Sequence, residues 1–361
     1  MRIAVITFPL INNYGGIIQA YALMKLLSDL GHEPVLINFQ SEKYSKSLMK
    51  YIVKKYMLFF IKKYRNSILT KKNYSLRKFI NLEINPRSEN IYNSKELYKY
   101  FLSNKFDACI VGSDQVFAKL GYSNFENVYS LGFLNKNIIK LSYAASFGGD
   151  KFLGDVEKIK YHSDNLKKFR KISVREKSGI KICQNTFGVD AVHVLDPTMV
   201  IDKNYYINLI SSNEYEKKEK ELFAYILDNT NEKEEIVSNI AEIKQYSVKK
   251  VSDGNLSTNV LSMEDWLGNI YNSEYIITDS FHGCVFCIIF NKPFNCIINN
   301  KRGADRFLSL LSLFGLEDRI LIDGYSEKNT NTNTDIDWEM VNSKIKSLKD
   351  YSIDFLKNNL I

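Results

Sequence analysis

The alternation of apolar and amphipathic segments predicts an α/β protein with two Rossmann-like domains that face a cleft. Short apolar runs of strand length alternate with helical segments over nearly the whole chain, a pattern typical of parallel sheets covered on both faces. At 361 residues the chain is long for one domain and natural for two. A polar, highly charged stretch at 211–220 interrupts the alternation. We therefore expect an N-terminal domain over 1–205, a C-terminal domain over 206–335, and a final helix over 336–361 that packs back on the first domain.

The first domain contains six apolar runs that favour strands and five amphipathic segments that favour helices. The expected strands are 3–8, 34–39, 108–112, 141–145, 171–174 and 193–195, and the expected helices are 16–30, 51–64, 95–104, 151–167 and 176–185. Because each strand is followed by a helix, consecutive strands should run parallel.

The second domain repeats the same strand–helix order. The expected strands are 222–227, 247–251, 275–277 and 294–298, and the expected helices are 233–244, 263–272, 284–290 and 304–314. A polar loop at 329–333 precedes a last segment, 338–358, whose apolar residues recur with the period of a helix.

The composition is that of an ordinary soluble globular protein, with 45% hydrophobic and 25% charged residues. Runs of about 18 apolar residues, which a membrane-spanning helix needs, do not occur. The first apolar run is too short for a signal peptide. Five cysteines, an odd number lying mostly in apolar runs, indicate reduced thiols. We therefore expect a cytoplasmic protein.

The positive charge is concentrated in one segment. The chain carries a net charge of +8, and residues 43–78 contain twelve Lys or Arg and no acid, so the rest of the chain carries −4. Such a local excess does not predict nucleic-acid binding. Segment 43–78 is compatible with a helix packed on the first domain with its lysines in solvent. It is also typical of a basic amphipathic helix that contacts an anionic membrane from the cytoplasmic side, which would suit an acceptor carried on a lipid diphosphate.

The strongest site candidate is the turn 278–283, which joins a buried strand to a short apolar helix. It contains Asp279, Ser280 and His282, one of only four histidines in the chain. Ligands of open α/β sheets bind beyond the carboxyl ends of the strands, and helix N-termini present free N–H groups to anions. A histidine that merely caps a turn is the alternative interpretation.

Three further groups of polar and small residues follow predicted strands of the first domain. They are Asn13, Tyr14, Gly15 and Gln19 after the first strand, Ser113, Asp114 and Gln115 after the third, and Ser146 after the fourth. These residues could hold sugar hydroxyls or accept a proton from one. The glycines do not form the dinucleotide-binding fingerprint, and simple tight or Asx-type turns are the alternatives.

Two more features have competing interpretations. Arg175 lies at another strand-to-helix junction, where its guanidinium could clamp a carboxylate or phosphate or form a salt bridge with Glu176 or a neighbouring carboxylate. His282, Cys284 and Cys287 have spacing compatible with zinc. Thiols within an apolar helix, however, usually behave as small hydrophobes, so we expect no metal and no other cofactor.

Taken in order along the chain, seven pieces of sequence closely resemble the polysaccharide pyruvyl transferase family. The pieces are 13–15 with 19–23, 112–116, 142–148, 173–176, 196–198, 279–283 and 291–294. The resemblance extends from the first strand to about Arg319. It implies a fold like that of the B-type glycosyltransferases and an enzyme that transfers pyruvyl from phosphoenolpyruvate to two hydroxyls of a sugar, forming a ketal. The sugar would belong to a surface polysaccharide, such as a capsule or exopolysaccharide, or to its lipid-linked precursor.

The resemblance, together with the residue types, gives a set of expected roles. His282, Asp114 and Asp279 are expected to be catalytic; Arg175, Ser280, Lys292, Arg302 and Arg306 to bind the donor; and Asn13, Tyr14, Gly15, Gln19, Ser113, Gln115 and Ser146 to bind the acceptor. Ser280 departs from the pattern, because other branches of the family carry Arg two residues before the histidine. A donor-binding cation must then come from elsewhere.

Two other functions compete with pyruvyl transfer. The first is a glycosyltransferase of similar fold that uses a nucleotide sugar, which would need a nucleotide-binding carboxylate such as Asp265 or Asp279. The second is a non-catalytic protein that binds glycans or lipid carriers. Acceptor-dependent release of phosphate from phosphoenolpyruvate would separate these functions.

Overall fold

The described residues form two compact units, each built on a parallel sheet. A computed structural model of the chain describes residues 1–40, 74–121, 126–135, 137–210, 220–252, 261–298, 303–322 and 335–361. Unit 1 takes the described residues within Met1–Lys63, Ile80–Ile201 and Leu348–Ile361, and unit 2 takes those within Tyr64–Phe79 and Asp202–Ser347. The expected helix 51–64, most of the basic segment 43–78, and Arg302 lie outside the described residues.

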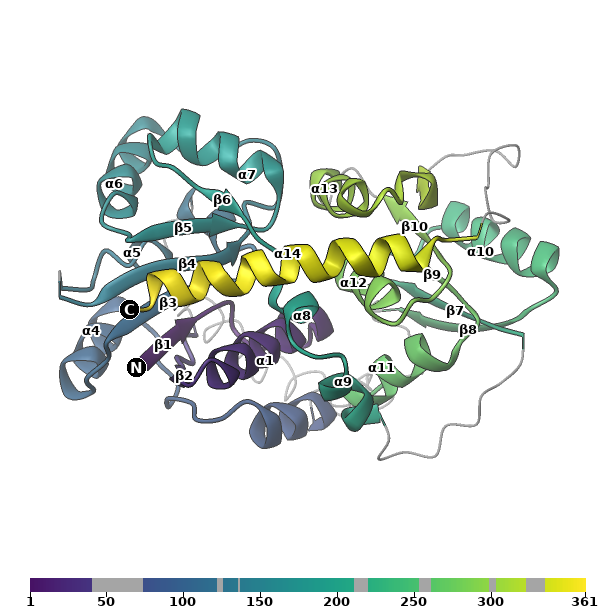
Figure 1. The fold of residues 1–361 in the computed structure, drawn as a ribbon, viewed down its shortest axis with the longest axis horizontal. Coiled ribbons are helices and arrows are strands. Elements are labelled where there is room, and N and C mark those ends of the chain that lie inside the picture. Colours follow the sequence, from purple (N-terminus) through teal and green to yellow (C-terminus); the bar gives the residue numbers. More distant parts are fainter. Residues whose placement is uncertain are drawn as a thin grey trace, which may run out of the picture. The chain divides into compact units, whose positions relative to one another are not determined.

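Unit 1 contains a sheet of six parallel strands (Figure 1). The strands are β1 (Arg2–Ile6), β2 (Glu33–Leu36), β3 (Ala108–Val111), β4 (Ile139–Ala145), β5 (Lys171–Val174) and β6 (Val192–His193). Their order across the sheet is β2-β1-β3-β4-β5-β6, and every neighbouring pair is parallel. The parallel α/β character predicted for the first half of the chain is therefore confirmed.

Helices cover both faces of the unit 1 sheet. They are α1 (Tyr14–Asp29), α4 (Ser94–Ser103), α5 (Glu126–Tyr129), α6 (Val156–Leu166), α7 (Lys177–Ile182), α8 (Pro197–Val200) and the end of α14 (Trp338–Asn359). Alternate strand residues point to opposite faces. Ala4 and Ile6 join the core with residues of α4, α6 and α7. On the other face Tyr143 contacts Phe355 of α14, with ring centroids 6.3 Å apart.

Local capping explains where one helix departs from its expected bounds. Helix α6 begins at Val156 rather than near 151, because Asp155 is its N-cap and its Oδ1 accepts a hydrogen bond from Lys158 N at 2.9 Å. After α7 the chain forms a π-helical turn, Cys183–Phe187. This turn ends at Gly188, which has the left-handed conformation.

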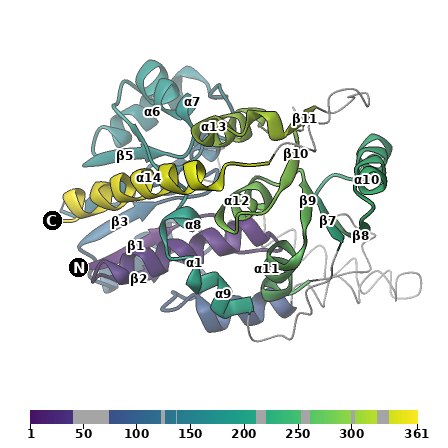
Figure 2. The same ribbon diagram turned by 45° about the vertical axis from the view of Figure 1, so that its right-hand side comes forward.

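Unit 2 contains a second parallel sheet, of five strands (Figure 2). The strands are β7 (Glu221–Ile226), β8 (Ser247–Ser252), β9 (Tyr275–Thr278), β10 (Phe294–Ile298) and β11 (Ile320–Ile322), in the order β11-β10-β9-β7-β8. The helices are α9 (Asn204–Ile210), α10 (Asn231–Lys244), α11 (Met263–Asn272), α12 (Phe281–Ile289) and α13 (Ala304–Phe314). Strand β11 was not expected from the sequence.

Aromatic packing fixes the helices of unit 2 against one face of its sheet. The Trp266 ring of α11 meets Tyr225 of β7 and Phe286 of α12 edge-on, with centroids 5.6 and 5.3 Å apart. Tyr206 of α9 joins them through Phe286 at 4.9 Å. Val237 of α10 packs on the opposite face with alternate strand residues. Within the described part of the chain, no helix is long and apolar enough to cross a membrane.

Each sheet has one position, here called the reversal point, from which successive strands are added in opposite directions across the sheet. In unit 1 it lies between β1 and β3, because β2 adds on one side of β1 and the later strands on the other. In unit 2 it lies between β7 and β9 for the same reason. Loops that follow the two strands diverge at such a point and leave a crevice, where open α/β sheets bind ligands.

Candidate functional site

A cavity lies at the reversal point of unit 1. Its volume is about 260 Å³. Seven residues line it, contributed by the loop after β1, the first turn of α1 and the segment after β3: Phe8, Pro9, Ile11, Asn13, Gly16, Asp114 and Lys119. Asn13 and Asp114 were expected at such a site, whereas Lys119 and the apolar residues were not singled out from the sequence. The cavity thus combines an apolar wall with one acid, one amide and one ammonium group.

The first turn of α1 is held by its cap. Asn13 has an extended backbone and its Oδ1 accepts a hydrogen bond from Gly16 N at 3.2 Å. That bond fixes the amide orientation, so Nδ2 remains as a donor. A Cβ on Gly16 would lie 3.2 Å from Asp114 Oδ2 and 3.4 Å from Asn13 Nδ2. Glycine at this position therefore leaves open the space that these two polar side chains flank.

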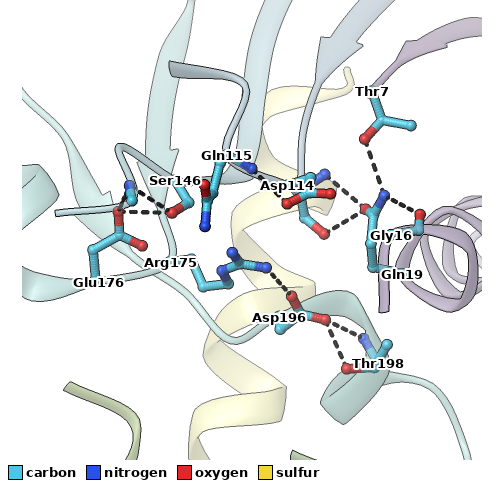
Figure 3. Close-up of polar contacts among 12 residues, drawn as sticks. Thr7, Gly16, Gln19, Asp114, Gln115, Ser146, Arg175, Glu176, Asp196 and Thr198 are labelled. Atoms are coloured by element: carbon cyan, nitrogen blue, oxygen red, sulfur yellow. Dashed lines mark hydrogen bonds and ion pairs between the residues drawn. The ribbon is translucent and has the colours of Figure 1, made fainter. Parts of the chain in front are cut away.

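Gln19 is buried and connects three segments beneath the cavity (Figure 3). Its Nε2 donates to Thr7 Oγ1 at 3.0 Å and to Gly16 O at 2.8 Å. Its Oε1 accepts from Ser113 N at 2.9 Å and from Ser113 Oγ at 2.7 Å. Both donors and both acceptor positions of the amide are thus engaged. Gln19 and Ser113 hold the loops together, and Tyr14 and Gly15 are buried beside them in α1.

Asp114 follows β3 and has one engaged and one available carboxylate oxygen. Oδ1 accepts a hydrogen bond from Gln115 N at 2.7 Å. Among the described residues none donates a hydrogen bond to Oδ2, the oxygen that lies over Gly16. The preceding Gly112 has φ +144°, and a Cβ there would overlap Tyr143 O, so only glycine fits at the end of this strand.

Ser146 follows β4 and interacts with a buried acid of the next strand–helix junction. Glu176 Oε1 accepts from Ser146 Oγ at 3.0 Å, from Phe147 N at 2.6 Å and from Gly148 N at 3.3 Å (Figure 3). The side chain of Gln115 lies against Gly148, where an added Cβ would be 3.1 Å from Gln115 Oε1. The structure therefore brings Gln115 and Ser146 together with Asp114 at one edge of the sheet.

Arg175 forms a buried ion pair with Asp196. A salt bridge with Glu176 or a neighbouring carboxylate is the alternative to a donor clamp that the sequence predicts. Arg175 Nη1 lies 3.0 Å from Asp196 Oδ2, and the two side chains are 2% and 1% exposed. Asp196 Oδ1 also caps α8, accepting from Thr198 N and Oγ1 at 3.1 and 2.7 Å. Burial acts to lower the pKa of Arg175, but nearby carboxylates outweigh it, so its pKa is raised. Those carboxylates are Asp196, Asp114 and Glu176, in decreasing order of effect.

The corresponding edge of unit 2 carries His282 in the first turn of α12. Ser280 is the N-cap, and its Oγ accepts from Gly283 N at 3.3 Å. Thr278 Oγ1 donates to Tyr225 O at 2.8 Å and accepts from Ser280 N at 3.1 Å. A Cβ on Gly283 would collide with that hydroxyl. His282 is 7% exposed and its ring meets Phe281 edge-on, with centroids 5.2 Å apart.

Asp279 is fully engaged by the protein itself. Its Oδ1 accepts from Leu227 N at 2.6 Å, and its Oδ2 accepts from Asp228 N at 3.2 Å and from Lys233 Nζ at 2.7 Å. Lys233 also donates to Asp228 O at 2.9 Å, and both side chains of the ion pair are 0% exposed. Asp279 therefore joins the end of β9 to the loop after β7, on the two sides of the reversal point of unit 2.

The expected donor-binding cations have different positions. Arg306, in the first turn of α13, lies with its guanidinium carbon 5.5 Å from the centroid of Phe281, the residue before His282. Lys292 lies two residues before the start of β10, with its ammonium 5.5 Å from the Tyr271 ring. Because the strands are parallel, Lys292 is at the edge of the sheet opposite His282. The structure thus places Arg306 beside Phe281, the residue before His282, and Lys292 at the other edge of the sheet.

The cysteines of α12 have apolar surroundings. Cys284 and Cys287 are buried, and burial raises the pKa of the Cys287 thiol well above its ordinary value. In the part of the chain that the structure describes, no group of three or more His, Cys, Asp or Glu side chains is placed to hold a metal ion.

Comparison with solved structures finds similar chains at low identity. UDP-N-acetylglucosamine 2-epimerase from Rickettsia bellii matches with 10% identity over 99% of this chain and 98% of its own, at a TM-score of 0.48. The epimerase from Methanocaldococcus jannaschii matches with 12% identity over 96% and 92%, at 0.48. UGT2 of Phytolacca americana matches with 13% identity over 98% and 95%, at 0.45. All three TM-scores are below 0.5, so the fold is assigned from the strand pairing.

Sequence comparison is more specific. No curated protein sequence matches the chain. A sequence model of the polysaccharide pyruvyl transferase family, however, matches residues 13–301, from the cap of α1 to beyond β10. The match includes both sheet edges described above and covers well over half of the chain. The chain therefore belongs to the polysaccharide pyruvyl transferase family.

Proposed function

We propose that the protein transfers pyruvyl from phosphoenolpyruvate to a sugar of a surface polysaccharide or of its lipid-linked precursor. Membership of the family indicates a transferase of polysaccharide pyruvylation, and the donor and the acceptor are the proposed part. The observation that carries the proposal is Asp114 beside the cavity, with one oxygen fixed by Gln115 N and the other receiving no hydrogen bond from the residues that the structure describes. A carboxylate held in this way is suited to accept the proton of a sugar hydroxyl.

The proposed reaction has clear chemical demands. Protonation of the terminal carbon of phosphoenolpyruvate makes its central carbon electrophilic, and a sugar hydroxyl attacks that carbon and loses its proton to a base. The C–O bond to phosphate then breaks, phosphate leaves, and a second hydroxyl closes the ketal ring. A proton donor, a base and cations for the carboxylate and phosphate of the donor are required.

The charges of unit 1 favour the acceptor there rather than the donor. The cavity holds one carboxylate and one ammonium group. Behind it, Arg175 is paired with Asp196 and lies near Glu176. An anionic donor would gain little in such surroundings, whereas a sugar offers hydroxyls that both donate and accept. We assign Asp114 as the base and Asn13 as a donor to the acceptor sugar. The contacts of Gln19 and Ser113 favour a supporting role.

The donor is assigned to unit 2. His282 would protonate the terminal carbon, and the first turn of α12 would accept the phosphate or carboxylate. Arg306 supplies a cation beside Phe281, which compensates for the absence of an arginine at Ser280. Asp279 stays an anchor of the β9–α12 turn in this assignment. That Arg175 clamps the donor stays a prediction. Its ion pair with Asp196 does not favour this role.

The test is phosphate release from phosphoenolpyruvate in the presence of p-nitrophenyl glucoside, galactoside or mannoside, with mass spectrometry of the sugar product. We expect release that depends on the sugar and a product heavier by one pyruvyl ketal. His282→Ala and Asp114→Asn should each lower kcat by a factor of about 10²–10⁴, with unchanged thermal unfolding. Sugar-independent release, or wild-type rates in both variants, would refute the assignment. Transfer from a nucleotide sugar without phosphate release would favour the glycosyltransferase instead.

A further inference from the structure

We propose that Glu176 is a positioning residue that holds Asp114 in place through the loop after β4. The proposal rests on the role assigned above to Asp114. It assigns a function to a side chain that lies outside the cavity and that the sequence suggested only as a salt-bridge partner.

The first step is the anchoring of the loop by Glu176. Glu176 is 0% exposed, and a single oxygen, Oε1, accepts hydrogen bonds from Ser146 Oγ, Phe147 N and Gly148 N. Three donors converging on one carboxylate oxygen from consecutive residues restrain the loop strongly, because hydrogen bonds to a charged acceptor are stronger than neutral ones. Ser146 Oγ accepts a further hydrogen bond from Gly148 N at 3.0 Å, which tightens the turn.

The second step is the connection from this loop to Asp114. Ser146 N donates to Asp114 O at 3.0 Å. In return, Ser146 O accepts from Phe117 N at 3.1 Å and from Ala118 N at 3.2 Å. The carbonyl of Asp114 and the main chain three and four residues after it are therefore bonded to Ser146, the residue that Glu176 holds. Gly148, with φ +74°, lies against the side chain of Gln115, whose N–H in turn orients Asp114 Oδ1.

The third step is the choice of a glutamate at this position. The side chain starts at the N-cap of α7 but makes no capping hydrogen bond to that helix. Its Oε1 is directed to the loop after β4 instead. Its negative charge also contributes to the raised pKa of the neighbouring Arg175. Glu176 is not among the residues that line the cavity, so it acts through Asp114 rather than on substrate.

The experiment is a double-mutant cycle over Glu176→Gln and Asp114→Glu, read as kcat/KM for the p-nitrophenyl hexoside that supports phosphate release. Glutamine retains the size of the side chain but removes its charge. In the wild-type background we expect Glu176→Gln to lower kcat/KM for the sugar by about 10–100-fold, with KM for phosphoenolpyruvate unchanged. In the Asp114→Glu background the longer side chain should no longer make the orienting contact with Gln115 N. There we expect Glu176→Gln to change kcat/KM for the sugar by no more than about twofold.

The outcomes separate the two proposals. An equal loss in both backgrounds, or no loss in the wild-type background, overturns the positioning role of Glu176. Wild-type rates in Asp114→Glu and Asp114→Asn overturn the assignment of Asp114 itself, and with it the proposed function.

If Glu176→Gln fails to fold, Ser146→Ala replaces it in the cycle, because it removes one of the three donors and leaves the two backbone N–H groups. The matched control is Ser163→Ala, which removes a hydrogen bond from α6 to Phe187 O in the same unit. It should lower thermal stability without changing kcat/KM. A loss of kcat/KM in the control equal to that in Ser146→Ala would also overturn the proposal.

Discussion

The first turns of α1 and α12 have the same capping arrangement and opposite surroundings. In each, a polar N-cap accepts a hydrogen bond from a glycine three residues later, Asn13 from Gly16 and Ser280 from Gly283. The missing side chain of Gly16 opens space beside a cavity, whereas that of Gly283 makes room for Thr278. The comparison teaches that a glycine in a capped first turn can either leave space beside a cavity or make room for internal packing.

The two acids that follow β3 and β9 differ in the same way. Asp114 has one oxygen bound by the adjacent N–H, and its other oxygen, over Gly16, accepts no hydrogen bond within the described part of the chain. Asp279 receives two backbone N–H groups and the ammonium of Lys233. Asp114 thus borders a cavity, whereas Asp279 joins the ends of two strands of its sheet. Both were expected to be catalytic, because sequence shows that an acid follows a strand but not what surrounds it.

The largest expected effect comes from breaking the buried pair of unit 2. Lys233→Met leaves the Asp279 carboxylate buried without its counter-ion, which should cost about 3–5 kcal/mol of unfolding free energy. The measurement is urea unfolding followed by tryptophan fluorescence. Both tryptophans of the chain, Trp266 and Trp338, belong to unit 2.

A second variant checks the cause of that loss. Lys233→Met combined with Asp279→Asn removes both charges, while the Asn oxygen can still accept from Leu227 N. Most of the lost stability should return, because no buried charge is then unpaired. A double variant as unstable as the single one would show that packing around Lys233, rather than charge, stabilises this edge.

The next effect sharpens the comparison of the two glycines. Gly283→Ala forces a Cβ against Thr278 and should lower the stability of unit 2 by about 1–3 kcal/mol, measured by the same fluorescence unfolding. In Gly16→Ala the atoms nearest to the new Cβ belong to the polar side chains of Asp114 and Asn13, at 3.2 Å or more. This substitution should leave stability nearly unchanged but raise KM for the sugar in the phosphate-release assay. Loss of stability in Gly16→Ala with normal KM would contradict the assignment of the space over Gly16 to the acceptor.

Much of the fold could be predicted because local signals mark its elements. Helix α11 begins where expected because Ser262 and Asp265 form a capping box, and α13 is bounded by Gly303 and Gly315 in the left-handed conformation. Strand β11 was missed because its three residues directly follow a short 3-10 helix. A strand this short has no clear pattern of its own and depends on pairing with β10.

Residues of the candidate site could be predicted only where they come shortly after a predicted strand in the sequence. Asn13 and Asp114, which line the cavity, were singled out in this way. Glu176 and Lys233 were not, because their partners lie 28 to 30 and 46 residues away in sequence, and only the fold brings the groups together. Lys292 illustrates the converse, since a cation near His282 in sequence lies at the other edge of the sheet.

The smallest effect tests unit 1 alone, through pH. His162 of α6 is fully buried, and its Nε2 lies 2.7 Å from Leu120 O, so Nε2 carries the proton and Nδ1 does not. Burial lowers the pKa of His162, with Lys158 acting in the same direction and the hydrogen bond to Leu120 opposing it. Its pKa is therefore lower in the folded than in the unfolded chain, and the folded state binds this proton more weakly. The stability that results is present above the unfolded pKa of about 6.5 and is lost as pH falls below it.

Calorimetric unfolding at pH 7.5 and 5.5 should show a lower transition temperature for unit 1 at the lower pH. His162→Gln can still donate to Leu120 O but cannot take up a proton, so the difference between the two pH values should shrink in this variant. If the difference in transition temperature between the two pH values is unchanged in this variant, other groups cause the acid sensitivity. His193 would then be replaced next, because burial also lowers its pKa.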